Sequence, residues 1–261
     1  MEIIEFNQTR ALLYEKAMTK YPNARVRDLS AMLEHLEPNK SDRILGFGEG
    51  NGYFCQSIAN RVGVSGKYLV TDPSNYQLAH LVSRLSLPQV EIKQIGVEGL
   101  SVEPSSFDKV WSFGAFHHSS NKAEAMKRIY SALDYGGKMV VCDVFQGSVL
   151  AKHFDDVVAK YCVTGHDVEF LSNDSAKYLC KQAGFKDSNI QIIDLPQKWL
   201  FRSESGLGEF IYQLHALTNL PGNMAGKISQ TVDSCRNILG VESVGAFYEL
   251  NWPMSALIAY K

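Results

Sequence analysis

Short apolar runs alternate with helical stripes of apolar residues between positions 41 and 145. The runs predict strands near 43–47, 67–72, 90–95, 107–113 and 138–144. Apolar residues three and four positions apart predict helices at 53–62, 74–86 and 121–134. Strands that are apolar throughout, such as Met139–Val141, are typical of a parallel sheet buried on both faces. With two further strands, near 189–194 and 255–260, the pattern predicts an α/β fold with a doubly wound, mostly parallel, seven-stranded sheet.

The flanking segments have a different pattern, from which we predict three parts. Residues 1–40 carry two helices, the second with an apolar stripe from Val26 to Leu36, and we expect them to cover the ligand site. Residues 41–146 form the ligand-binding core. Residues 147–261 contain a lid helix near 148–162, the last helix and strands of the sheet, and a helical cap. The cap is an insertion at about 196–250, rich in aromatic residues.

A glycine-rich loop follows the first predicted strand. In the segment Arg43–Gly52, glycines stand at positions 46, 48, 50 and 52, directly before a predicted helix. No register matches the dinucleotide fingerprint G-x-G-x-x-G, and no phosphate-loop sequence occurs. Asp72 ends the second strand, about 20 residues further on, where doubly wound folds bind a ribose diol. The combination favours a nucleoside ligand without a pyrophosphate over a tight turn that binds nothing.

The composition of the chain argues against several classes of function and location. The 261 residues include 26 basic and 28 acidic side chains, so no overall positive charge favours binding to nucleic acid or an anionic membrane. No apolar run approaches the roughly 18 residues of a membrane-spanning helix. The first five residues carry acidic charge, unlike a signal peptide. Five cysteines without a C-x-x-C pair suggest reduced thiols, and we expect a cytoplasmic protein.

Four motifs in order resemble the Rossmann-like (class I) superfamily of S-adenosylmethionine-dependent methyltransferases. They are the G-x-G-x-G loop at Gly48–Gly52, the acid Asp72, the run Ser106–His118 that ends in paired histidines, and the turn Leu133–Met139. The small-molecule enzymes similar to ubiquinone and menaquinone biosynthesis methyltransferases are the nearest type. The resemblance implies methyl transfer from S-adenosylmethionine, with S-adenosylhomocysteine as product. We expect the acceptor to be a small organic molecule, aromatic or hydrophobic, methylated at oxygen, nitrogen or an activated carbon.

The resemblance also assigns roles to individual residues. Backbone N–H groups of Gly48, Glu49, Gly50 and Gly52 would hold the methionine part of the cofactor, and Asp72 would bind the ribose hydroxyls. The resemblance also implies that adenine lies beside Val97 and Glu98, and that the sulfonium lies beside Ser112 and Phe113.

Three positions depart from the family pattern. Glycines at 46 and 96 stand where the family usually has acids, and Tyr135 stands where it usually has proline. Loss of the two acids would weaken cofactor binding. An alternative hypothesis follows, in which the chain is a non-catalytic relative that binds a metabolite or a partner protein. A third is an enzyme that uses the adenosyl cofactor for a reaction other than methyl transfer.

His117 and His118 are the candidate general bases, because an unperturbed imidazole titrates near pH 6.5. In an extended segment their side chains would point in opposite directions, so at most one would face the ligand. A rival cluster lies at 153–167, where His153 and Asp156 would share a helix face near His166 and could bind a divalent metal. We favour a solvated charged helix there and predict no metal.

Overall fold

The computed structural model describes residues 5–261, which divide into two compact units. One unit is a sheet flanked by helices, made of residues 31–145, 169–195 and 255–261. The other is mainly helical and comprises residues up to 30, with 146–168 and 196–254. We call them the sheet unit and the helical unit and describe each separately.

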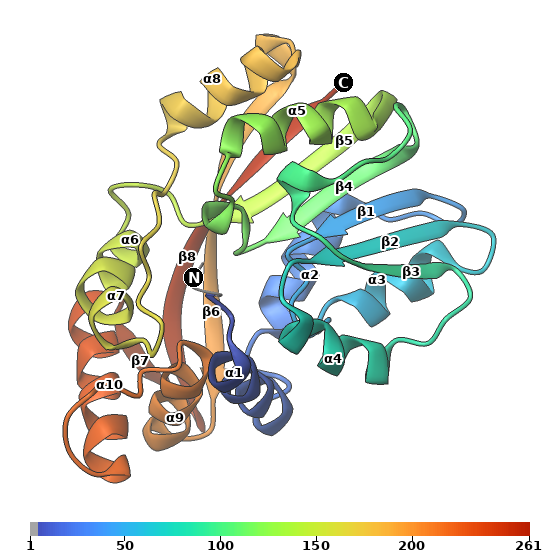
Figure 1. Ribbon diagram of the computed structural model, residues 1–261. Helices are drawn as coiled ribbons and strands as arrows, with labels where there is room; N and C mark the ends of the chain where they lie inside the picture. The colour runs from blue at the N-terminus through green and yellow to red at the C-terminus, as the bar shows by residue number, and fades with distance from the viewer. Residues whose placement is uncertain (1–4) are drawn as a thin grey trace. The chain divides into compact units, whose positions relative to one another are not determined.

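The sheet unit is built on strands that run in parallel from its edge to its centre (Figure 1). Its strands are β1 (Arg43–Phe47), β2 (Lys67–Asp72), β3 (Val90–Gln94), β4 (Phe107–Phe113) and β5 (Leu133–Asp143), with parts of β6 (Ile190–Phe201) and β8 (Phe247–Tyr260). The strand order is β3-β2-β1-β4-β5-β8-β6. The pairs among β1 to β5 are all parallel, whereas β8 is antiparallel to β5. The carboxyl ends of β1 to β5 therefore meet at one edge.

Helices cover both faces of this sheet because successive strand residues point to opposite sides. They are α3 (Cys55–Val62), α4 (Asn75–Arg84), α5 (Lys122–Ala132) and α8 (Asn173–Ala183), with short 3-10 turns at Val97–Gly99, Phe116–His118 and Asp187–Asn189. Leu45, on one face, belongs to a core shared with Met126 of α5 and Cys180 of α8. Tyr68 and Trp111, both buried, lie on the other face, where Tyr68 contacts Cys55 of α3. Side-chain caps fix the starts of α4, α5 and α8.

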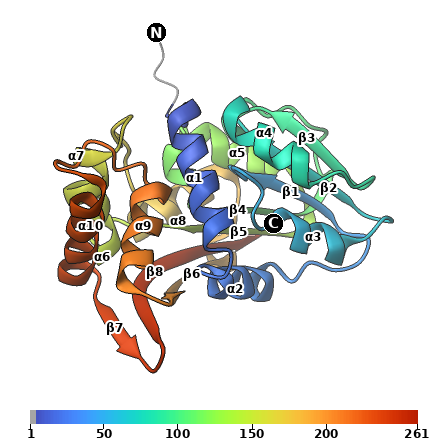
Figure 2. The same cartoon turned by 90° about the horizontal axis from the view of Figure 1, so that it is seen from below.

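The helical unit contains α1 (Gln8–Lys20), α9 (Glu204–Leu214) and α10 (Met224–Ile238), and both α1 and α10 pack on α9 (Figure 2). A further helical segment runs through α6 (Val149–His153), a π-helical turn (Phe154–Val158) and α7 (Ala159–Tyr161). Strand β7 (Val241–Val244) forms a hairpin with the start of β8. Helix α2 (Val26–Leu36) contributes residues to both units.

The predicted fold class is confirmed, with differences in detail. The sheet has eight strands rather than seven, because β7 was not predicted. Strands β6 and β8 are about twice the predicted length, since their halves in the helical unit were assigned to the cap. Strand β5 begins at Leu133, within the segment predicted as a turn. The lid helix near 148–162 is interrupted by the π-helical turn. Within residues 5–261, no helix combines the length and apolarity needed to cross a membrane.

Candidate functional site

The glycine loop connects β1 to α3 at the carboxyl edge of the sheet. Gly48, Gly50 and Gly52 have φ angles of 66°, 56° and 76°, in the left-handed region that L side chains rarely adopt. A Cβ atom at Gly48 would lie 2.2 Å from the Cβ of Ala115, and one at Gly52 would lie 2.8 Å from Cγ of Leu81. The loop therefore needs glycine for both its conformation and its close packing. The N–H groups of Glu49 and Gly52, which were predicted to hold a ligand, donate instead to the carbonyls of Thr71 and Glu49 over 3.3 and 2.9 Å.

Asp72 lies next to this loop, at the end of β2. Its Oδ2 accepts a hydrogen bond from the Gly50 N–H over 2.9 Å, and its Oδ1 accepts one from the Ser74 N–H over 2.8 Å. Burial raises the pKa of Asp72 to about 6, against the opposing effect of these two N–H donors. At neutral pH the carboxylate is mostly ionised and retains acceptor capacity for hydroxyl groups.

The glycine at position 46 has a structural explanation. A Cβ atom there would lie 1.7 Å from Oε1 of Glu49 and 2.8 Å from Nε1 of Trp111, so the Glu49 carboxylate occupies the space of a side chain at 46. Glu49 Oε1 accepts a hydrogen bond from Tyr68 over 2.6 Å, and its Oε2 lies 3.3 Å from Sγ of Cys55. An acidic group is thus present beneath the loop, supplied by a residue three positions later.

At position 96, too, the carboxylate of a nearby glutamate lies beside the Cβ position of a glycine. A Cβ atom at Gly96 would lie 3.0 Å from Oε2 of Glu98. Oε1 of Glu98 accepts a hydrogen bond from the Ser120 hydroxyl over 2.9 Å. Val97, between Gly96 and Glu98 in the sequence, is buried and belongs to the same core cluster as Leu45. The two missing acids, which motivated the hypothesis of a non-catalytic relative, are each matched by a neighbouring glutamate.

Ser112 and Phe113 end β4 beside the glycine loop. Oγ of Ser112 lies 3.8 Å from the Cβ position at Gly48, and within residues 5–261 this buried hydroxyl has no hydrogen-bond partner. The ring of Phe113 lies 5.2 Å from the ring of Phe54, which directly precedes α3. Both predicted residues therefore adjoin the loop, and Ser112 offers a polar group for a ligand.

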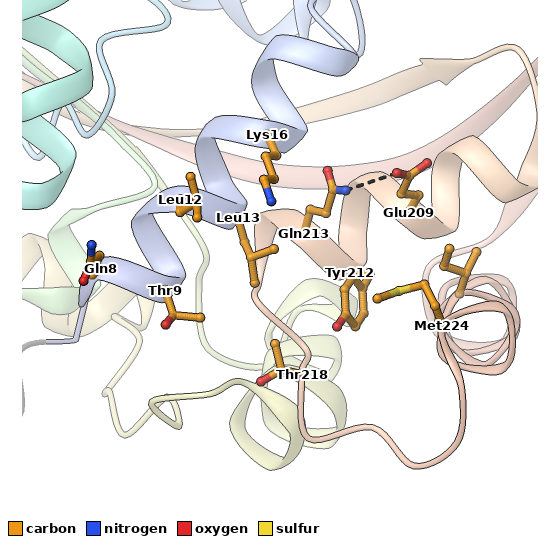
Figure 3. A pocket seen from close by; sticks show the side chains of 11 residues that line it. Gln8, Thr9, Leu12, Leu13, Lys16, Glu209, Tyr212, Gln213, Thr218 and Met224 are labelled. Carbon is orange, nitrogen blue, oxygen red and sulfur yellow. Dashed lines mark hydrogen bonds between the residues drawn. The ribbon is translucent and has the colours of Figure 1, made fainter.

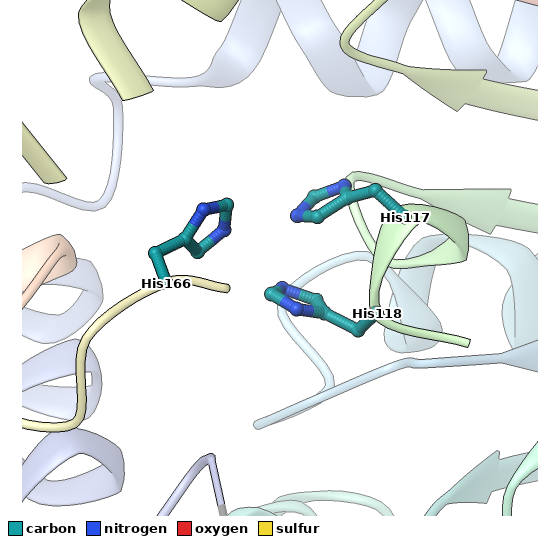
Figure 4. Close-up of side chains that lie close together, drawn as sticks. All are labelled: His117, His118 and His166. Atoms are coloured by element: carbon teal, nitrogen blue, oxygen red, sulfur yellow. The ribbon is translucent and has the colours of Figure 1, made fainter. Parts of the chain in front are cut away.

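His117 and His118 follow β4 in a 3-10 turn, so the expectation of extended geometry was wrong. Their ring centroids are 3.9 Å apart, and both rings project from the same turn (Figure 4). His117 is buried, and its Nδ1 lies 2.5 Å from Oδ1 of Asp143 at the end of β5. Burial alone would raise the pKa of Asp143, but the charge and hydrogen bond of His117 outweigh burial and hold that pKa below its usual range.

Asp143 is the main site residue that the sequence analysis did not assign. It ends the apolar run of β5, the strand beside the one that leads to the histidines. Its place at the carboxyl end of a strand could have identified Asp143 as a site residue from the sequence. The buried partners of Glu49 had no such signal, because Tyr68 and Cys55 meet it only through the packing of α3 on β2.

The structure separates His153 and Asp156, the two residues of the rival metal cluster that would share a helix face. His153 is buried in the helical unit, with ring centroids 6.1 Å from His215 and 5.8 Å from Trp252. Asp156 instead forms ion pairs with Lys152 and Lys160 on the outer side. The π-helical turn that begins at Phe154 changes the register, so His153 and Asp156 do not share a face. The prediction of a solvated helix holds for Asp156 and is wrong for His153.

The helical unit also contains a cavity of about 520 Å³, in the size range of small-ligand sites (Figure 3). Leu12, Leu13 and Lys16 of α1 line it, together with Tyr212 and Gln213 of α9. Nε2 of Gln213 donates to Glu209 over 3.1 Å, while its buried Oε1 has no partner within residues 5–261. The lining combines apolar surface with an unsatisfied acceptor and a cation.

Comparison with known proteins relates this geometry to a family. Residues 44–137 match the family model described as a methyltransferase domain. The tRNA U34 carboxymethyltransferase of Cellvibrio japonicus is 30% identical over 116 residues, which cover 42% of this chain and 35% of that protein. The arsenite methyltransferase of Aquipseudomonas alcaligenes is 28% identical over 160 residues, covering 57% and 45%. The chain thus spans less than half the length of either relative.

Solved structures show the same fold. Haemonchus contortus phosphoethanolamine N-methyltransferase 2 in complex with S-adenosyl-L-methionine superposes with a TM-score of 0.67 at 18% identity, covering 99% of this chain and 58% of that one. The YcgJ protein from Bacillus subtilis gives 0.62 at 16% identity, covering 90% and 99%. The narrower resemblance to ubiquinone and menaquinone enzymes stays a prediction. Residues 44–137 therefore match a methyltransferase domain, and the chain shares its fold with these solved structures.

Proposed function

We propose that this chain is an S-adenosylmethionine-dependent methyltransferase that acts on a small organic molecule. The observation that carries the proposal is the hydrogen bond between the Gly50 N–H and the Asp72 carboxylate. It joins the glycine loop to a buried acid, which are the two groups that a nucleoside with a polar tail requires. The match of residues 44–137 to a methyltransferase domain supports the same cofactor.

The residues at the carboxyl edge fit this cofactor. The backbone of the segment 48–52 would lie against the methionine end, and Asp72 would accept hydrogen bonds from the ribose hydroxyls. Glu98 and Val97 would lie near adenine, and Ser112 and Phe113 near the sulfonium. When bound, the cofactor supplies a methyl group on a positively charged sulfur. The protein must then align the acceptor for in-line attack and exclude water.

His117 is the proposed general base. Asp143 lies against its Nδ1 and also accepts its backbone N–H over 2.9 Å, so the ring is held in one orientation. With Nδ1 directed at the carboxylate, Nε2 is the nitrogen that accepts a proton from the acceptor atom. His118, whose ring lies against that of His117, is the second candidate. A base is needed only where the attacking oxygen or nitrogen carries a proton.

Two observations support a small acceptor. The chain carries 26 basic and 28 acidic residues, so it lacks the excess of positive charge that favours binding to the phosphates of a nucleic acid. The cavity in the helical unit has the volume of a small-ligand site, and its apolar wall with Lys16 and Gln213 suits a molecule with both apolar and polar parts. The charge balance and the cavity lining agree equally well with methylation at oxygen, nitrogen or an activated carbon.

A second candidate is transfer to tRNA, because six of the curated relatives are named tRNA U34 carboxymethyltransferase. A transfer assay separates the candidates. The protein is incubated with methyl-labelled S-adenosylmethionine and either a fractionated pool of small metabolites or total tRNA. Label in a small-molecule fraction, lost in a His117→Asn variant, supports the proposal. Label in tRNA alone would favour the second candidate.

A further inference from the structure

Glu49 occupies an unusual place in the glycine loop. Its backbone lies between Gly48 and Gly50, which both have positive φ angles. Its side chain turns under the loop into the space that Gly46 leaves open, as the 1.7 Å distance from Oε1 to the Cβ position at 46 shows. A potentially charged group is therefore fixed directly beneath the backbone that would receive a ligand.

The hydrogen-bond partners of this carboxyl group are all uncharged. Tyr68 Oη lies 2.6 Å from Oε1, and Sγ of Cys55 lies 3.3 Å from Oε2. Nε1 of Trp111 donates to Tyr68 Oη over 3.1 Å, which completes the cluster. Tyr68, Cys55 and Trp111 are each at most 1% exposed, so water is largely excluded on this side.

No cation in the sheet unit compensates a charge on Glu49. Within residues 5–261, Glu49 takes part in no ion pair with lysine, arginine or histidine. The ionisable groups that face it are Tyr68 and Asp72 of β2 and Cys55 of α3, and a charge on Asp72 repels its own. Arg84 of α4 donates to the carbonyl of Asn51, in the glycine loop, over 3.2 Å.

These surroundings favour the uncharged acid. Burial is the largest effect and raises the pKa of Glu49 to about 8, and the charge of Asp72 acts in the same direction. Hydrogen bonds from Tyr68 and Cys55 act against this shift without cancelling it. An uncompensated buried carboxylate is costly, and protonation avoids that cost until a cation arrives.

We propose that Glu49 holds a proton while the glycine loop is empty and releases it when a cationic ligand binds there. The ligand class is a nucleoside bearing a sulfonium group, so the inference rests on the proposed function. The carboxyl O–H bond breaks, the proton passes to solvent, and the ligand's positive charge replaces it beside the carboxylate. Glu49 is thereby a positioning residue for the charged end of the cofactor.

The coupling between ligand binding and proton release from Glu49 should differ between the cofactor and its product. The sulfonium of S-adenosylmethionine carries a charge that the thioether of S-adenosylhomocysteine lacks. Binding of the cofactor should therefore release more protons than binding of the product. Loss of the methyl group would return a proton to Glu49 and weaken the hold on the product, which aids product release.

Calorimetric titration in two buffers of different ionisation enthalpy measures this release. At pH 7.5 a group with a pKa of about 8 is about three-quarters protonated, whereas Asp72, with a pKa of about 6, is almost fully ionised. The wild-type protein should release several tenths of a proton more with S-adenosylmethionine than a Glu49→Gln variant does. The ligand's own amino group, which titrates at about 7.7–8.0, contributes to both proteins alike. Glu103→Gln, at an exposed position of the same unit, should match the wild type.

A comparison within the wild-type protein keeps the test decisive if the variant does not fold. Equal proton release with S-adenosylmethionine and S-adenosylhomocysteine would overturn the proposal, as would equal release by the wild type and a folded Glu49→Gln variant. Greater release with the sulfonium ligand supports it. Absence of binding by the wild type in both buffers is a different result, which would contradict the proposed function itself.

Discussion

Asp143 contacts His117 twice, with Oδ1 lying 2.5 Å from the ring Nδ1 and Oδ2 accepting the backbone N–H over 2.9 Å. Asp143 ends β5, and His117 lies in the 3-10 turn that follows the neighbouring parallel strand β4, so the pairing of the two strands brings the residues together. A carboxylate that fixes both the ring and its backbone leaves the imidazole little freedom. This arrangement suits a base that must meet an acceptor in one orientation.

The first prediction concerns this pair. His117→Asn should lower the rate of transfer to a proton-bearing acceptor by about 10²–10⁴-fold, the usual contribution of a general base. Asp143→Asn should keep the ring but alter its proton position, and it should shift the pH profile of kcat. Steady-state kinetics between pH 5 and 9 would show both effects. His80→Asn, on α4, serves as the control, and a His117→Asn rate within twofold of the wild type would exclude the base role.

The second prediction tests the packing of Glu49 into the space at Gly46. Gly46→Ala should destabilise the protein by about 1–3 kcal/mol, since the added Cβ overlaps the carboxylate. Combining it with Glu49→Ala should recover stability, with a coupling of about 1 kcal/mol or more. Urea unfolding of the four proteins gives the coupling directly. Gly226→Ala is a control without such an overlap, and additive effects at 46 and 49 would show that the two positions are independent.

The third prediction concerns acid stability. Burial lowers the pKa of His153 to about 4, below the unfolded value of 6.5. Between these values the unfolded chain binds more protons than the folded one, so stability is full above pH 6.5 and falls as the pH drops toward 4. The loss could reach about 3 kcal/mol, at 1.36 kcal/mol per pKa unit.

A His153→Phe variant, with the ring kept among Phe154, His215 and Trp252, should lose less stability on acidification than the wild type. Denaturant unfolding at pH 4.5 and 7.5 measures the difference, with His35→Gln as control. Parallel losses in the wild type and His153→Phe would count against a buried neutral imidazole.

The fourth prediction is the pH dependence of product binding. Because Asp72 must be ionised to accept both ribose hydroxyls, affinity for S-adenosylhomocysteine should decline as the pH falls through about 6. Asp72→Asn should flatten this dependence while weakening binding at neutral pH. Titrations at half-unit steps from pH 5 to 7.5 would reveal the midpoint. A midpoint near 4, the ordinary value for aspartate, would mean that the carboxyl group is not desolvated as described.

The strands could be predicted from the sequence where their apolar residues are also their buried residues. Strands β1, β2 and β4 agree with the predicted bounds. Four of five residues of β1, five of six of β2 and four of seven of β4 are buried, so apolar composition and burial coincide there. The halves of β6 and β8 in the helical unit mix exposed and buried residues and resemble loop or cap in composition. Strand β7, with three exposed residues out of four, gives hardly any apolar signal.

The site was predictable in outline and not in its contacts. Glycine spacing and Asp72 marked the loop because a tight turn and a strand-end acid leave local signatures. The fit of Glu49 beneath Gly46 depends on Tyr68 and Trp111, which adjoin it only after the strands have paired. Similarly, His117 meets Asp143 across a sequence separation of 26 residues. Such contacts arise from sheet topology rather than from local sequence.

The most direct test of the central claim is calorimetric titration of the protein with S-adenosylhomocysteine at pH 7.5. The account predicts micromolar binding that weakens by about 100-fold or more in Asp72→Ala, since hydrogen bonds to a charged group contribute about 1.5–3 kcal/mol each. Asp167→Ala, at an exposed position of the helical unit, should bind as the wild type does. Thermal unfolding would verify that each variant is folded. A folded wild-type protein that binds no adenosyl ligand, or an Asp72→Ala variant that binds equally well, would contradict the assignment of this loop as the cofactor site.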